Sequence, residues 1–103
     1  MLGKRKSDRT VTLIAPGTEI VGSVHFGDQL YVNGVVRGDL FANDDQEATV
    51  VVSATGRVTG DIRVPNVVIS GHVEGNVHAG RRVELSAGAR VRGNVYYRLM
   101  EME

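Results

Sequence analysis

A glycine-centred motif of five residues occurs five times in this chain, and it constrains the fold more than any other feature. In each copy, one aliphatic residue stands two positions before the glycine and another stands two positions after it. The residue directly after the glycine is always small and polar. The copies are IVGSV (20–24), VRGDL (36–40), VTGDI (58–62), VEGNV (73–77) and VRGNV (91–95). Internal repeats on this scale are typical of solenoids, so the motif predicts stacked structural units.

An apolar triplet precedes each motif, and a second glycine lies between the two. The triplets are LIA (13–15), LYV (30–32), VVV (50–52), VVI (67–69) and VEL (83–85). The second glycines are Gly17, Gly34, Gly56, Gly71 and Gly88. Glycine allows positive φ and close backbone approach, so these positions indicate corners. The segments between them are rich in Val, Ile and Thr with a period of two, which predicts three short strands per repeat.

Units of this size cannot bury their inner faces alone, but stacked neighbours can. The repeat therefore predicts an all-β, single-domain parallel β-helix of about five to six three-stranded turns. Equivalent residues would lie above one another in two interior ladders. These are Val36, Val58, Val73 and Val91, and Leu40, Ile62, Val77 and Val95. We expect the β-helix over residues 11–98, between a flexible basic tail (1–10) and a short C-terminal tail (99–103).

The two ends of such a β-helix carry a functional prediction. Terminal turns expose unpaired N–H and C=O groups, and solenoids normally cover them with a polar or helical cap. Neither TVTLIAPG (10–17) nor VYYRLM (95–100) is polar enough to be a cap. We therefore expect self-association into a homopolymer, with the ends pairing either like with like or head to tail. The predicted interface is Leu13, Ile14, Ile20 and Val24 at one end and Val91, Val95, Tyr97 and Leu99 at the other.

Several stretches together resemble one known family. They are the start MLGK with its basic run, the phrase TLIAPGTEIVGSV (12–24), and the segments VNGVVRGDL (32–40) and VISGHVEGNV (68–77). The chain is similar over residues 1 to about 98 to the bactofilins, a polymer-forming bacterial cytoskeletal family. The resemblance implies a right-handed β-helix and filaments that assemble without nucleotide or other cofactor. It also implies attachment to the inner face of the cytoplasmic membrane and a scaffold role for cell-shape, cell-wall or polarity proteins.

The N-terminal tail is the candidate for membrane attachment. Residues 1–10 carry a net charge of +3, and the remainder of the chain carries −3. Each basic side chain near an anionic surface contributes about 1 kcal/mol, which is marginal for a single chain. In a filament many tails act together, so polymerisation would stabilise attachment. The predicted membrane-binding residues are Met1, Leu2, Lys4, Arg5 and Lys6; the alternative is a disordered basic end.

Other chemistries find little support in the sequence. His25 and His78 stand three residues after their motif glycines in the first and fourth repeats, too far apart to share an ion bound at about 2 Å, and His72 lies on another stretch. The acidic segment NDDQE (43–47) lacks calcium-loop spacing. We therefore expect surface histidines and no metal site. The basic residues Arg81, Arg82, Arg90, Arg92 and Arg98 lack a base-stacking aromatic array, so we expect no nucleic acid partner.

An enzyme remains the alternative to a structural protein. Left-handed β-helices of the hexapeptide-repeat type include trimeric acyltransferases and metal-dependent carbonic anhydrases. Such proteins need strict six-residue units, whereas the motif glycines here are 16, 22, 15 and 18 residues apart. The chain also has no cysteine nucleophile and no phosphate-binding loop ending in Lys-Ser/Thr. We therefore expect a scaffold without catalytic residues.

Overall fold

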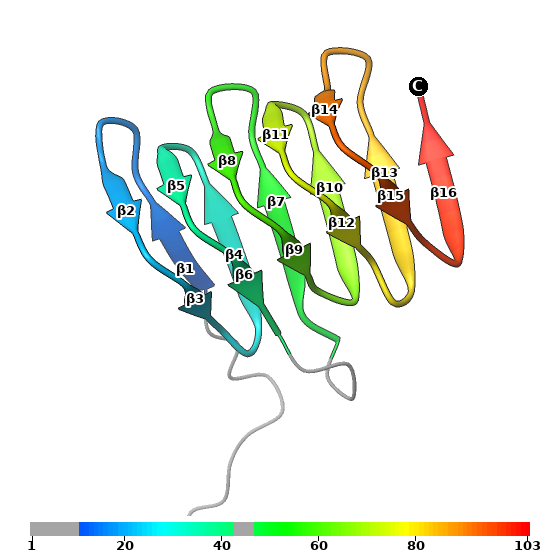
Figure 1. The fold of residues 1–103 in the computed structure, drawn as a ribbon, viewed down its shortest axis with the longest axis horizontal. Coiled ribbons are helices and arrows are strands. Elements are labelled where there is room, and N and C mark those ends of the chain that lie inside the picture. Colours follow the sequence, from blue (N-terminus) through cyan, green and yellow to red (C-terminus); the bar gives the residue numbers. More distant parts are fainter. Residues whose placement is uncertain (1–10, 43–46) are drawn as a thin grey trace, which may run out of the picture.

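The computed structural model describes residues 11–42 and 47–103. In those residues the regular structure is entirely β, and Figure 1 shows the chain winding into a rod in which each turn adds one strand to each of three sheets. Every neighbouring pair of strands is parallel. The predicted parallel β-solenoid with three-stranded turns is confirmed.

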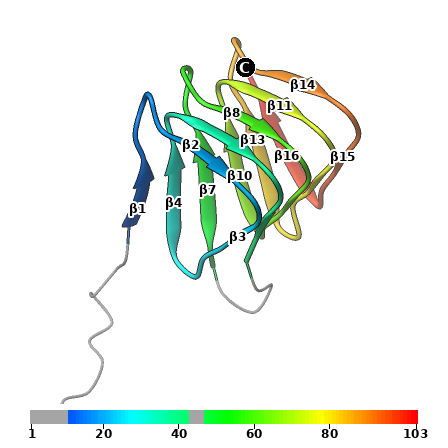
Figure 2. The ribbon, with the colours of Figure 1, turned by 60° about the vertical axis from the view of Figure 1, so that its left-hand side comes forward.

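The three sheets, called A, B and C, run the length of the rod, and Figure 2 shows strands of sheet A side by side. Sheet A contains β1 (Val11–Ile14), β4 (Gln29–Val32), β7 (Thr49–Val52), β10 (Asn66–Ile69), β13 (Arg82–Leu85) and β16 (Leu99–Met102). Sheet B contains β2 (Glu19–Val21), β5 (Val35–Arg37), β8 (Arg57–Thr59), β11 (His72–Glu74) and β14 (Arg90–Arg92). Sheet C contains β3 (Val24–His25), β6 (Leu40–Phe41), β9 (Ile62–Arg63), β12 (Val77–His78) and β15 (Val95–Tyr96).

The motif residues form the interior as predicted. In sheet B, Val58 pairs with Val36 on one side and Val73 on the other, and Val73 pairs with Val91. In sheet C, the aliphatic residues two positions after each motif glycine pair in the same way, from Leu40 to Val95. Residues in the middle turns of both ladders are completely buried. The narrow core is therefore built from stacked aliphatic side chains of moderate size, which is consistent with the small number of aromatic residues.

The first apolar triplet aligns differently from the prediction. Leu13 pairs with Tyr31 and Ile14 with Val32, so the counterpart of LYV (30–32) is TLI (12–14) and the predicted LIA (13–15) is one residue out of register. Successive strand residues face opposite sides, so a slip of one residue exchanges inner and outer faces. Ile14 is accordingly buried, and Leu13 lies on the outer face of sheet A.

The C-terminal boundary also differs from the prediction. The expected tail of residues 99–103 contains β16, which pairs in register with β13 over four residues. Met100 lies over Val83 and Met102 over Leu85, so both methionines continue inward-facing positions of the sheet. The solenoid therefore begins a sixth turn on sheet A, because alternating Met and Glu residues satisfy the inside–outside pattern of a strand.

The corners explain the uneven spacing of the motifs. The corner between sheets A and B alternates along the rod between four residues (15–18, 53–56, 86–89) and two residues (33–34, 70–71). Figure 1 shows the longer corners, after β1, β7 and β13, projecting beyond the shorter ones. By contrast, every corner between sheets B and C has two residues, the motif glycine and the small polar residue after it. The motif therefore has a constant length because the corner that it contains always has two residues.

The small polar residue forms a hydrogen-bonded ladder along this constant corner. The Oδ1 atom of Asp39 accepts a hydrogen bond from the backbone N–H of Asp61 at 2.8 Å. Asp61 Oδ1 accepts from the Asn76 N–H, and Asn76 Oδ1 from the Asn94 N–H, both at 3.0 Å. A short side chain with an acceptor oxygen is therefore required in each middle turn, which accounts for the presence of Asp or Asn at this position.

Candidate assembly interface

Each end of the rod presents three strand edges without a neighbour in the described residues. β1, β2 and β3 are the outermost strands at the N-terminal end, and β16, β14 and β15 are outermost at the C-terminal end. A parallel edge strand directs unpaired N–H and C=O groups outward and can template further strand pairing. Both ends of this solenoid therefore have the geometry needed to extend the sheets into another molecule.

The core ladders are incompletely buried at both ends. Ile20 and Val24 in the first turn are half-buried, whereas Val36 and Leu40, their neighbours in the second turn, are fully buried. The same difference occurs at the other end, where Val91 and Val95 are half-buried, although Val73 and Val77 beneath them are fully buried. These terminal residues occupy core positions that lack a covering turn, so stacking of another copy would bury them.

Four of the predicted interface residues lie on sheet A or next to it, and they divide into two groups. Ile14 is buried and faces inward. Tyr97 occupies the inward position that buried Ala79 holds one turn below; the hydrogen bond from the Ala79 N–H to the Tyr96 carbonyl sets this alignment. Leu13 and Leu99 face outward and are 57% and 52% exposed. All eight predicted residues thus lie in terminal turns, but two of them flank the ends.

Sequence reasoning missed three inward-facing residues at the ends of sheet A. Thr12 lies next to buried Leu30 in the first turn, while Met100 and Met102 cover Val83 and Leu85 in the last. Met102 is 68% exposed even though it continues a core position. The signal was the period of two within β16, where Met100 and Met102 alternate with outward residues. A flexible methionine can adapt its shape to a facing surface, so these side chains add to the candidate interface.

The predicted membrane-binding residues Met1, Leu2, Lys4, Arg5 and Lys6 lie outside the described residues, as do positions 43–46 of the acidic segment. Within residues 11–42 and 47–103, no helix is long and apolar enough to cross a membrane. Val11, the residue that follows the tail in sequence, begins β1, the outermost strand of sheet A at the N-terminal end.

The histidines lie on the outside of the rod. His25 stacks on Phe41 with ring centroids 4.9 Å apart, and His78 stacks on Tyr96 at 4.7 Å. His72 lies in β11 on a different sheet. No group of three or more His, Cys, Asp or Glu side chains in the described part of the chain could hold a metal ion. Aromatic stacking across parallel strands therefore accounts for the surroundings of His25 and His78.

The basic residues near the C-terminus do not form a single stripe. Arg81 contacts Glu47 at 3.4 Å, and Arg82 contacts both Glu84 and Glu101 on sheet A. Arg90 and Arg92 lie instead in β14 on sheet B, on either side of the core residue Val91. The arginines are thus divided between two faces of the rod, and two of them are paired with glutamates.

The fold defines a class of protein: a parallel β-solenoid whose terminal strands have no further neighbour in the part of the chain that the structure describes. Residues 12–103 match the bactofilin family, described as polymer-forming cytoskeletal. The chain is 32% identical over 84 residues, 82% of its length, to the bactofilins BacO and BacP of Myxococcus xanthus. It resembles the mutant crystal structure of a Thermus thermophilus bactofilin with a TM-score of 0.82 and 33% identity, covering 91% of this chain and 100% of that one. The chain belongs to the bactofilin family.

The two Myxococcus relatives are longer than the matched region. The alignment covers 64% of BacO and 33% of BacP. The comparison therefore concerns the matched 84 residues and not the complete relatives.

Proposed function

We propose that this chain polymerises end to end, without nucleotide, into filaments that act as a scaffold at the inner face of the cytoplasmic membrane. The observation that carries the proposal is the incomplete burial of core positions at both ends, together with unpaired strand edges there. Growth beyond a dimer requires both ends to be competent, and both have these features. The description of the family as polymer-forming supports self-association.

Nucleotide independence follows from the nature of the proposed contact. Strand pairing and burial of Ile20, Val24, Val91 and Val95 would supply the interface directly from groups already in place. Apolar burial contributes about 25 cal/mol per Å² without any chemical step. A filament built this way needs no bound nucleotide to order its subunits.

Membrane attachment would use the N-terminal tail, with Met1 and Leu2 as the apolar part and Lys4, Arg5 and Lys6 as the basic part. The tail leaves each copy from its first turn, so a filament would carry one tail per subunit. Many weak tails on one polymer produce stable attachment through a high effective concentration. The attached filament would then organise cell-shape or cell-wall machinery, including polarity proteins, along the membrane.

We further propose that the role is structural and not catalytic. The hexapeptide-repeat enzyme alternative requires turns of constant length, but paired positions of sheet A are separated by 16 residues between Asn66 and Arg82 and by 20 between Gln29 and Thr49. The difference lies between sheets C and A, where seven residues separate β6 from β7 but only three separate β12 from β13. The spacing therefore follows the length of this corner and not a six-residue unit.

Electron microscopy of the purified chain in physiological salt tests the central step. Negative staining without added nucleotide should show thin, straight filaments, and added ATP or GTP should change neither their number nor their length. A discrete trimer in the same buffer, by microscopy and sedimentation, would contradict the proposal and support the enzyme alternative.

Liposome co-sedimentation tests the membrane step separately. The full chain should pellet with vesicles containing anionic lipid. A chain lacking residues 1–7 should remain in the supernatant when the same vesicles are pelleted. The matched control is the triple change of Lys4, Arg5 and Lys6 to Gln, which keeps the length and the apolar residues. Equal binding of all three proteins would exclude the tail as the attachment site. Filament pelleting without vesicles must be subtracted in each case.

A further inference from the structure

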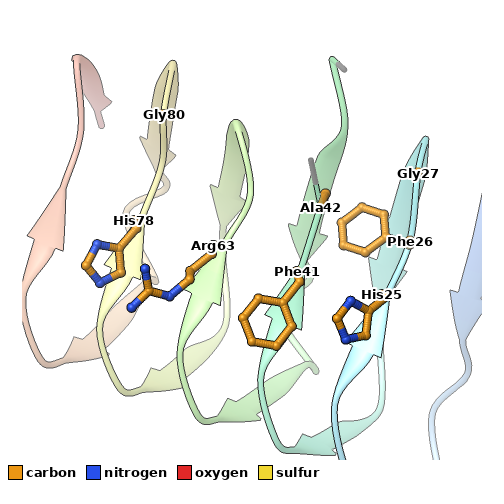
Figure 3. Close-up of a pocket in the computed structure, with 8 residues that line it drawn as sticks. All are labelled: His25, Phe26, Gly27, Phe41, Ala42, Arg63, His78 and Gly80. Carbon is orange, nitrogen blue, oxygen red and sulfur yellow. The ribbon is translucent and has the colours of Figure 1, made fainter. Parts of the chain in front are cut away.

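A groove on the outer face of sheet C is lined by none of the residues of the candidate assembly interface. It has a volume of about 750 Å³ and crosses four turns of the rod. Figure 3 shows His25, Phe41, Arg63 and His78 in a row on successive strands of the sheet. The lining residues are His25, Phe26, Gly27, Phe41, Ala42, Arg63, His78 and Gly80. We call this feature the sheet C groove.

Aromatic side chains are concentrated in the groove. The chain contains only two phenylalanines, Phe26 and Phe41, and both line it half-exposed. His25 stacks on Phe41 and provides a third ring. Aromatic residues and arginine are enriched at protein interfaces, where rigid rings bury a large area at a small entropic cost. The groove thus combines the residue types that anchor partner chains.

The charge of the groove is complementary to an anion. Arg63 is exposed and forms no ion pair in the described residues, and none of the lining residues is acidic. By contrast, Arg37 on sheet B contacts Glu19 at 2.6 Å. A guanidinium next to aromatic rings and without a carboxylate partner can bind an incoming carboxylate through two parallel hydrogen bonds. The imidazoles of His25 and His78 provide further donors on either side.

We propose that the sheet C groove binds a partner peptide in which a carboxylate side chain stands next to an apolar one. Arg63 holds the carboxylate, and the apolar side chain lies against Phe26 and Phe41. The partner is a peptide and not a nucleic acid, because Arg63 is the one arginine or lysine among the lining residues, which suits a single carboxylate but not a row of phosphates. A filament would repeat the groove once per subunit, and this part of the inference rests on the proposed function. The groove itself belongs to a single chain.

Fluorescence anisotropy with a short labelled peptide of alternating glutamate and leucine tests this site. The wild-type chain should bind it more tightly than the same peptide with glutamine in place of glutamate. Arg63→Gln should weaken binding of the glutamate peptide by about tenfold or more, the loss expected for a charge-assisted bidentate contact. Arg63→Lys should restore only part of it. Phe41→Ala should weaken both peptides, because it removes the apolar contact.

The control is Arg57→Gln, which removes an exposed arginine from the same turn but on sheet B. Equal effects of Arg57→Gln and Arg63→Gln would overturn the proposal, because binding would then reflect overall charge. Failure of the glutamate peptide to bind at all would overturn it too. Tighter binding of a labelled oligothymidylate that is lost in Arg63→Gln would show that the groove takes nucleic acid instead.

A chain carrying Val95→Glu separates this inference from the proposed function. If that variant remains monomeric and binds the peptide with the same affinity per chain, the groove is independent of assembly. Filaments that form normally but bind no peptide would refute the groove alone. Peptide binding by a wild-type chain that never forms filaments would refute the proposed function alone.

Discussion

The middle turns and the terminal turns of this solenoid carry the same kinds of residue at the same positions, yet they differ in burial. Val58 in the third turn is 0% exposed, but Val91, in the same ladder two turns later, is half-exposed. The residue type and its position within the turn are identical. What differs is whether a turn lies on each side, so a core position in this fold is made by neighbouring turns.

This difference has a consequence for function. A globular domain completes its core within one chain, whereas the motif at each end of this rod has no covering turn among residues 11–42 and 47–103. Stacking another copy would give Ile20 and Val91 the surroundings that Val36 and Val73 already have. The forces that hold successive turns together can therefore hold successive molecules together, and mutations that act differently at the middle and the ends would test this relation.

The largest expected effect comes from a charge in the middle of the core. Val58→Asp should destabilise the fold by more than about 4 kcal/mol, because it buries an unpaired carboxylate between Val36 and Val73. A small domain has only about 5–15 kcal/mol to lose, so circular dichroism should show a chain largely unfolded at mild urea concentrations.

Val91→Asp is the matched change in the terminal turn. Its carboxylate reaches water, so the loss of stability should be about 1 kcal/mol. Equal losses of stability for Val58→Asp and Val91→Asp would mean that Val91 is already covered in the isolated molecule. That result would contradict the difference in burial between middle and terminal turns.

The second effect concerns the motif glycine. Gly60 has φ +147°, and a Cβ atom there would lie 2.2 Å from the carbonyl oxygen of Gly38 in the turn below. Gly60→Ala should therefore cost roughly 2–4 kcal/mol, from backbone strain and steric overlap together. Gly22 also has positive φ, but a Cβ atom there meets nothing within 4 Å. Gly22→Ala should cost only about 1–2 kcal/mol, and urea denaturation should resolve the two variants.

The middle of the fold could be predicted from sequence because the motif contains its own corner. Gly60 and Asp61 separate two strands by the same two residues as in every other copy, so the register of both ladders follows from aligning the glycines. Sheet A could not be aligned in this way, since the corner before the motif has four residues after β1 but two after β4. That variation placed the first triplet one residue out of register.

The C-terminal end and the groove were missed for different physical reasons. β16 has no motif after it to mark it as a strand, and Glu101 occupies the outward position opposite Glu84. The groove gathers residues from four turns, none of which forms a local pattern. Its signal was available in the position three after each motif glycine, which holds His25, Phe41, Arg63 and His78 in successive copies.

A third, smaller effect follows from the polar ladder beside the motif glycines. Asp61→Ala leaves the Asn76 N–H without its acceptor and should cost about 1 kcal/mol. Asp61→Asn should be nearly neutral, because Asn76 performs the same function one turn later with its own Oδ1. Asn94→Ala should also be nearly neutral, since no described turn lies above it to use that oxygen. A loss in Asn94→Ala as large as in Asp61→Ala would indicate an acceptor role for Asn94 within the single chain.

The smallest effect on folding should be accompanied by the largest effect on assembly. A glutamate at Val95 or at Tyr97, which is 50% exposed, lies at the open end and should change the unfolding free energy by no more than about 1 kcal/mol. Either substitution would bury a charge if another copy stacked on that end, so electron microscopy should show no filaments. The control is Tyr96→Glu, an outward residue on the same strand that stacks on His78. Intact filaments in Val95→Glu would remove the C-terminal end from the interface. Loss of filaments in Tyr96→Glu alone would move the contact to the outer face of the rod.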